Sequence, residues 1–250
     1  MLKICRLQFI HSHNFIHRDL KPSNIVMGLG KHANVAYIIN FGLSKEFWDP
    51  CTRRHIPYDN TFGLIGLATF SSIHSHLGME HERQDDLELL AYILIYFLRS
   101  SLPWQRLYFE GHDLVAESKQ QSSTHDLCNG LPLEFHAFLD YSRSLSFYNK
   151  PDYDYLRSLF DNSLSQVGLQ SDVAFDWDKS DGSVDKQWCA PRELYLIGSS
   201  TPILRSTKSE YPNFKICSRV DDFTQIYIVR LFNKYQLLLW ITFLNSTQPL

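Results

Sequence analysis

Two short motifs, separated by a pattern typical of a β-hairpin, constrain the fold of this chain more than any other feature. The first, HRDLKPSN, occupies residues 17–24, and the second, NFG, occupies residues 40–42. Between them, two β-prone apolar runs at residues 25–27 and 35–39 flank a turn that contains glycine, which predicts a pair of antiparallel strands. Because the first motif ends and the second begins with an asparagine, we expect these two side chains at neighbouring strand ends, where both could face one metal site.

The first motif contains the residue types that phosphoryl transfer requires. Asp19 would orient an attacking hydroxyl and accept its proton, and Lys21 would place a positive charge near the transferred phosphate. Asn24 and Asn40 would offer amide oxygens to Mg²⁺, a cation that prefers oxygen ligands. Every fixed position of the protein-kinase signature H-R-D-L-x-x-x-N is matched, so the segment resembles a kinase catalytic loop. A surface cluster of charges is the alternative, and eight ordered positions with the downstream turn make it much less plausible.

Longer matches resemble the casein kinase 1 family of serine/threonine kinases, from about residue 1 to residue 177. They comprise NFIHRD at 14–19, MGLGK at 27–31, HIPY at 55–58, SI at 72–73, HLG at 76–78, DDLE at 85–88, SLPWQ at 101–105 and KPDYDYLR at 150–157. The resemblance implies the C-terminal lobe of a protein kinase, mainly α-helical with a small β-hairpin. It also implies transfer of the ATP γ-phosphate to serine and threonine hydroxyls of protein substrates, with Mg²⁺.

The resemblance assigns supporting roles around the catalytic loop. His17 and Arg18 would support the loop, and Asp86 would be a buried carboxylate that accepts hydrogen bonds from its backbone N–H groups. An ordinary acidic residue at a helix start, where the helix dipole favours it, is the alternative for Asp86. The whole DDLE sequence at residues 85–88 favours the supporting role.

Several positions depart from the family pattern and weaken the expectation of activity. Asn40 replaces the aspartate that would hold Mg²⁺, so the site keeps an oxygen but loses a charge, and metal and ATP binding should be weakened. Leu67 replaces a threonine that would bond the catalytic aspartate and lysine. Thr69 replaces an arginine that would help to bind an anion near the substrate, and Gln84 replaces a basic residue.

The chain starts sixteen residues before His17, where the resemblance implies an entire β-rich N-terminal lobe. No G-x-G-x-x-G loop and no strand of the V-A-I-K type occurs later, so the residues that would grip the ATP phosphates are missing. We therefore expect a truncated, partly degenerate copy with impaired activity. A pseudokinase that binds protein partners without catalysis and a non-functional gene fragment are the alternatives.

Hydrophobic periodicity places the remaining elements. Helices are predicted near residues 85–99, 112–120, 132–145 and 152–165, and the chain should begin inside a helix. Residues 43–78 are expected to form activation and substrate-binding loops. The apolar run at residues 87–98 is too short to span a bilayer and predicts a buried core helix. Residues 1–177 should form the lobe, and residues 178–250 a C-terminal extension, linker-like and then apolar, with no assigned role.

Composition narrows the class of protein further. The net charge of −3 gives no sign of nucleic-acid binding, and protein substrates or protein partners are expected instead. The five cysteines are widely spaced without a C-x-x-C pair, which favours free thiols in a reducing compartment. Without a signal peptide or transmembrane span, a cytoplasmic or nuclear location is expected. The sequence does not indicate an oligomeric state.

Overall fold

The structure is a computed structural model that describes residues 2–28 and 35–167 of the chain. Its helices are α1 (Leu2–Ser12), α2 (Ile73–His76), α3 (Arg83–Arg99), α4 (His112–Gln121), α5 (Thr124–Cys128), α6 (Leu133–Ser144) and α7 (Tyr153–Val167). Its strands are β1 (Phe15–Ile16), β2 (Ile25–Met27), β3 (Ala36–Ile38), β4 (Lys45–Glu46), β5 (Trp48–Asp49) and β6 (Arg54–His55). The fold is therefore mainly helical with small strand pairs, as predicted. The proposed extension at residues 178–250 lies outside the described residues.

The described strands form three antiparallel pairs, β1 with β4, β2 with β3, and β5 with β6. The predicted hairpin is confirmed, because β2 and β3 pair with Ile25 opposite Ile38 and Met27 opposite Ala36. The segment from residue 43 to residue 78, predicted as loops, also contains the three short strands β4 to β6 and the four-residue helix α2. These elements are too short for a hydrophobic period to become visible in the sequence.

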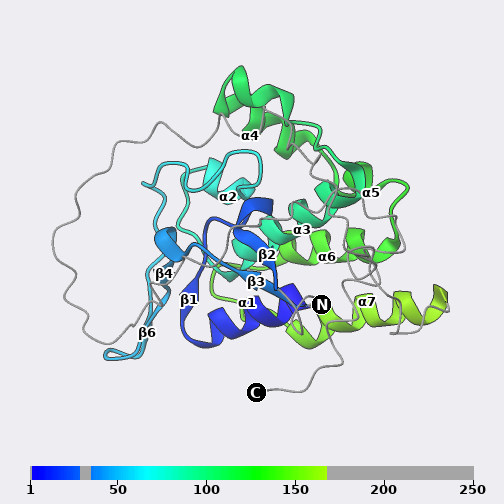
Figure 1. Ribbon diagram of the computed structural model, residues 1–250. Helices are drawn as coiled ribbons and strands as arrows, with labels where there is room; N and C mark the ends of the chain where they lie inside the picture. Colours follow the sequence, from blue (N-terminus) through cyan, green and yellow to red (C-terminus); the bar gives the residue numbers. More distant parts are fainter. Residues whose placement is uncertain (1, 29–34, 168–250) are drawn as a thin grey trace.

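Helix α3 is the centre of the core. Thirteen of its seventeen residues are buried, as expected for a helix that is apolar around most of its circumference. At its start, the backbone N–H of Glu82 donates to Asp85 Oδ2 at 2.7 Å, which satisfies a polar group at the helix N-terminus. Figure 1 shows α3 in the middle of the lobe, with α6 beside it and α1 and α7 along one side.

The predicted helices are confirmed within two residues at their ends, including the helix at the start of the chain, α1. Each contributes apolar side chains to one continuous core. Its largest fully buried members include Trp104, Tyr92, Phe135, Phe138 and Phe160. Helix α4 packs against α2 at the top of Figure 1 and contributes Val115 to the core. None of the helices in the described part is long and apolar enough to cross a membrane.

Candidate catalytic site

The segment 17–24 places a carboxylate, an ammonium group and an amide within hydrogen-bonding distance of one another. Lys21 Nζ lies 2.9 Å from Asp19 Oδ2. The Asn24 amide Nδ2 donates to the backbone oxygen of Asp19 at 2.7 Å and to its Oδ2 at 3.0 Å. Both side-chain contacts end on the same carboxylate oxygen, and Asp19 is only 6% exposed. The carboxylate is therefore fixed in orientation by two donors before any substrate is bound.

The segment is anchored from below by Asp86, in the first turn of α3. Its two carboxylate oxygens accept hydrogen bonds from the backbone N–H groups of His17, at 2.7 Å, and Arg18, at 2.8 Å. Arg18 has a φ of 67°, a left-handed conformation that a residue with a side chain adopts only when its surroundings hold it there. Burial alone would raise the pKa of Asp86, but hydrogen bonds from His11 and the loop hold that pKa below its ordinary value.

Sequence reasoning missed His11, which connects this anchor to the rest of the core. Its Nε2 lies 2.9 Å from Asp86 Oδ2, and its Nδ1 lies 2.5 Å from the hydroxyl of Tyr153 at the start of α7. His11 is buried, at 4% exposure, on a helix whose other buried side chains are apolar. A histidine on an apolar helix face was the signal in the sequence, because such a residue needs buried hydrogen-bond partners.

The second motif approaches the first through the hairpin. His17 Nδ1 accepts from the backbone N–H of Asp19 at 3.3 Å, so its Nε2 carries the proton that is donated to the backbone oxygen of Ile39 at 3.1 Å. The imidazole also packs edge-on against Phe41, with ring centroids 5.1 Å apart. These contacts place residue 40 beside the catalytic loop, and Asn40 adopts a left-handed conformation there, with a φ of 66°.

The two asparagines expected to bind Mg²⁺ do come together, but they face each other as donor and acceptor. Asn40 Nδ2 lies 3.4 Å from Asn24 Oδ1. A divalent cation needs oxygen atoms, usually with carboxylate charge, around a shared point. Here one amide presents N–H groups to the oxygen of the other, and neither carries a charge. This donor set does not fit a tightly held Mg²⁺ ion as it is arranged.

The segment 64–72, which includes the departures at Leu67 and Thr69, packs directly against the catalytic loop. Gly66 has a φ of +81°, and a Cβ atom there would lie 2.9 Å from the backbone oxygen of Arg18 and 3.4 Å from Asp19 Oδ1. Only glycine permits this approach without displacing the backbone. Thr69 is buried, and its backbone oxygen accepts from Trp104 Nε1 at 2.7 Å.

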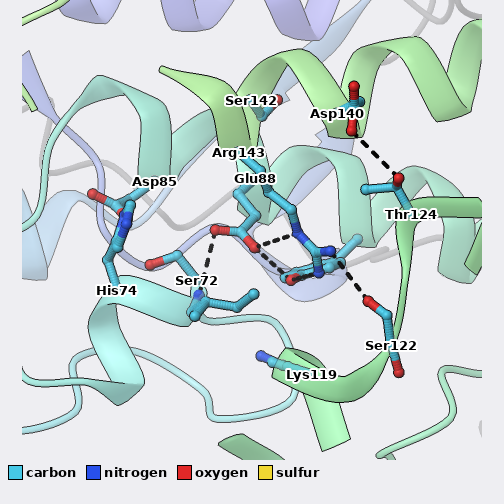
Figure 2. Close-up of polar contacts among 12 residues, drawn as sticks. Ser72, His74, Asp85, Glu88, Lys119, Ser122, Thr124, Asp140, Ser142 and Arg143 are labelled. Carbon is cyan, nitrogen blue, oxygen red and sulfur yellow. Dashed lines mark hydrogen bonds and ion pairs between the residues drawn. The ribbon is translucent and has the colours of Figure 1, made fainter. Parts of the chain in front are cut away.

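A second polar network, also missed in the sequence, ties α3 to α6. Glu88 Oε1 accepts from the Tyr92 hydroxyl at 2.5 Å and from Arg143 Nε at 3.2 Å, while Oε2 accepts from the backbone N–H of Ile73 at 3.3 Å. Figure 2 shows Glu88 and Arg143 facing each other, with α2 below them. Burial, together with the Glu88 charge, raises the pKa of Tyr92 well above its ordinary value. This network fixes the start of α2 and, through it, the end of the segment 64–72.

An open cavity of about 400 Å³ lies beside the segment 64–72. Residues 60–64, His76, Leu77 and Gly78 line one side, and His112, Asp113 and Ala116 of α4 line the other. Among the described residues, its lining mixes polar and apolar groups, and Asp113 is its only acidic side chain, with no lysine or arginine. The cavity is thus a concave surface between the segment around residues 60–64 and helix α4, and none of the residues 17–24 lines it.

One comparison with known families bears on this arrangement. Residues 2–62 match the protein kinase domain. The matched segment contains both motifs, the hairpin between them and Asp19, Lys21 and Asn24. It supports a protein kinase family for this chain, and the mainly helical fold with its small hairpin corresponds to a kinase-like C-terminal lobe. In the described ranges, only two-stranded sheets occur, and none of them is the larger sheet of a kinase N-terminal lobe.

Proposed function

We propose that residues 1–177 form the catalytic lobe of a serine/threonine protein kinase of casein kinase 1 type, with weakened activity. The observation that carries this proposal is the Asp19 carboxylate, fixed through Oδ2 by Lys21 and Asn24 on a loop whose backbone Asp86 anchors. The family match over residues 2–62 supports a kinase in general. The finer assignment rests on the resemblance in the longer sequence motifs, which continue to residue 177.

In the proposed reaction, a serine or threonine hydroxyl of a protein attacks the γ-phosphorus of ATP. A bond forms between the hydroxyl oxygen and phosphorus, the bond from phosphorus to the β,γ-bridging oxygen breaks, and ADP leaves. Asp19 orients the hydroxyl and takes its proton, and Lys21 supplies positive charge beside the transferred group. These residues perform positioning and charge stabilisation, which account for most of the catalysis in this class of reaction.

The proposal includes reduced affinity for metal-bound ATP. Mg²⁺ would supply charge neutralisation to the ATP phosphates, and the resemblance assigns its binding to Asn24 and Asn40, whose present arrangement does not suit the ion. Because Asn40 has no charge and directs its N–H group at Asn24 Oδ1, both the ion and the nucleotide should bind weakly. The resemblance implies a threonine that bonds Asp19 and Lys21 at position 67, and because Leu67 has no hydrogen-bonding group, the site should be positioned less precisely.

The direct test is transfer of labelled γ-phosphate from ATP to a protein substrate, with this chain joined behind a kinase N-terminal lobe. The change Asp19→Asn should reduce the rate by about 10²–10⁴-fold, the usual contribution of a positioned acid–base group. Asp140→Asn, at an exposed carboxylate on α6 outside the loop 17–24 and outside the cavity, is the control and should leave the rate unchanged. Equal rates for the parent and Asp19→Asn would show that Asp19 is not the catalytic base and would overturn the proposal.

A further inference from the structure

Lys119 is a buried lysine that neither the kinase motifs nor the proposed reaction explains. It lies on α4 with 0% of its surface exposed, whereas lysine is almost never fully buried without partners. Its Nζ donates to the backbone oxygens of Ala68, at 2.7 Å, and of Ser71. In Figure 2 its side chain extends from α4 toward the region where Glu88 and α2 meet.

The surroundings of Nζ supply two carbonyl acceptors, an imidazole nitrogen and two aromatic faces. Besides the two carbonyl oxygens, Nζ lies 3.2 Å from His76 Nε2, and the faces of Tyr92 and Trp104 lie 5.0 and 5.2 Å away. Burial and the neighbouring Lys119 lower the pKa of His76 to about 4, so its imidazole is neutral. Its Nε2 also lies 3.1 Å from the Ala68 oxygen, so this nitrogen either accepts from Nζ or donates to that oxygen, depending on the tautomer. Aromatic faces stabilise a desolvated cation at such distances.

The contacts with the two carbonyls do not depend on the charge of the lysine. Burial lowers the pKa of Lys119 to about 7, although the negative charge of Glu88 opposes this shift. A neutral amine still has two N–H groups, which is the number needed for Ala68 and Ser71. The lysine can therefore hold both carbonyl oxygens on either side of neutral pH.

Both carbonyls belong to one tight turn, residues 67–71. Inside the turn, the backbone N–H groups of Phe70 and Ser71 donate to the backbone oxygen of Leu67, at 2.8 and 2.9 Å. From outside the turn, Lys119 Nζ donates to the backbone oxygens of residues 68 and 71, and Trp104 Nε1 donates to that of residue 69. The turn is therefore held by side chains that come from a different part of the chain, about fifty residues later along α4 for Lys119.

The turn 67–71 also lies next to the Asp19 carboxylate. Ser71 Oγ lies within hydrogen-bonding distance of two backbone oxygens, 2.8 Å from that of Ile65 and 3.0 Å from that of Leu67, and its single O–H group donates to one of them or is shared between both. A Cβ atom on Gly66 would lie 3.4 Å from both Ser71 Oγ and Asp19 Oδ1. A displacement of the turn would therefore change the shape of the surface directly beside Asp19, and it would also alter the cavity between this segment and α4.

We propose that Lys119 is a positioning residue that holds the turn 67–71 in place beside Asp19, so that α4 controls how a protein substrate binds. This proposal rests on the proposed kinase function for its consequence, because the substrate is the protein hydroxyl that Asp19 receives. Its structural part, the fixing of the turn by Lys119, can be measured without any catalysis.

The first measurement is hydrogen exchange at the amides of Phe70 and Ser71 in the full chain. Lys119→Met keeps a long unbranched side chain and removes the donors, and it should accelerate exchange at these two amides at least tenfold while amides in the middle of α3 keep their rates. Val115→Ala, at a buried apolar residue one turn earlier on the same face of α4, is the matched control. It should leave the two turn amides as slow as in the parent.

Unchanged exchange at Phe70 and Ser71 in Lys119→Met would overturn the proposal. So would an acceleration that is equal in the turn and in α3, because that pattern reports a loss of global stability rather than of local positioning. An acceleration confined to the turn supports it.

The second measurement separates positioning from a packing role in catalysis. This measurement uses the chain joined behind a kinase N-terminal lobe, as in the test of the proposed function. There, Lys119→Met should raise the KM for the protein substrate at least tenfold and leave the KM for ATP within twofold. A residue that only stabilises the fold would lower the apparent kcat and leave both KM values unchanged. If the parent transfers no phosphate, the proposed function fails, and the exchange rates at Phe70 and Ser71 still decide whether Lys119 holds the turn.

Discussion

Removal of the Asp86 carboxylate should destabilise the lobe more than any other change to a single polar side chain near the catalytic loop. Asp86 is 1% exposed and accepts hydrogen bonds from two backbone N–H groups and from His11. In Asp86→Ala, all three donors lose their acceptor inside the protein. Leaving a buried hydrogen-bond donor without an acceptor costs about 1–3 kcal/mol, so three such donors together cost about 3 kcal/mol or more. Since domains unfold with about 5–15 kcal/mol, this is a large fraction of the total.

The assay is urea unfolding followed by far-ultraviolet circular dichroism at pH 7. Asp86→Ala should lower the free energy of unfolding by about 4 kcal/mol with little change in the denaturant slope. Asp113→Ala removes an exposed acid from the first turn of another helix, α4, and should cost about 0.3–1 kcal/mol, the value of a helix-dipole contact. A loss for Asp86→Ala no larger than that for Asp113→Ala would refute the view that this carboxylate anchors the catalytic loop.

Three further changes probe the contacts around the site. Gly66→Ala places a Cβ 2.9 Å from a catalytic-loop carbonyl at a φ of +81° and should cost about 1–3 kcal/mol in urea unfolding, while Gly63→Ala, which has open space around it, should cost little. Arg143→Met leaves Glu88 buried without its cation and should lower the unfolding free energy by about 3–5 kcal/mol in the same assay. His76 has its pKa lowered by burial to about 4, so the stability it contributes is present above pH 6.5 and is lost as the pH falls toward 4; acid titration of His76→Asn should show a smaller loss.

The sequence predicted the elements whose apolar residues form a recognisable run or period. Helix α3 was predicted because its apolar run is longer than a strand and has no breaker inside it, and the hairpin was predicted from two short β-prone runs around glycine. Helices α2 and α5 have four and five residues, so neither completes two turns of a hydrophobic period. The pair β1–β4 joins segments about thirty residues apart in sequence, and β5 and β6 have only two residues each, too few for an alternating pattern to show.

The same distinction applies to the candidate site. Asp19, Lys21 and Asn24 lie within one loop, so their spacing in sequence already places them near one another. His11 and Lys119 act through residues 75 and about fifty positions away, and no local pattern records such a contact. Their only local signal is chemical, a polar side chain on a buried helix face. Lys119 lies four residues after the buried Val115, which puts both on the same side of α4.

The position of Asn40 could be predicted, but its hydrogen bond could not. The hairpin spacing placed it close to Asn24, whereas the direction of its amide depends on the left-handed backbone at residue 40 and on the partner it meets there. A charged aspartate at this position could not donate a hydrogen bond to Asn24 Oδ1. Its oxygens would instead be available to a cation.

The measurement that tests the central claim most directly is therefore Mg²⁺-dependent phosphate transfer by Asn40→Asp. The parent chain and the variant are each joined behind the same kinase N-terminal lobe, and the initial rate is followed as the Mg²⁺ concentration rises at fixed ATP. The account predicts that the variant is faster and reaches half its maximal rate at a lower Mg²⁺ concentration. Equal rates and equal Mg²⁺ dependence in the two proteins would contradict the claim that Asn40 weakens a kinase metal site.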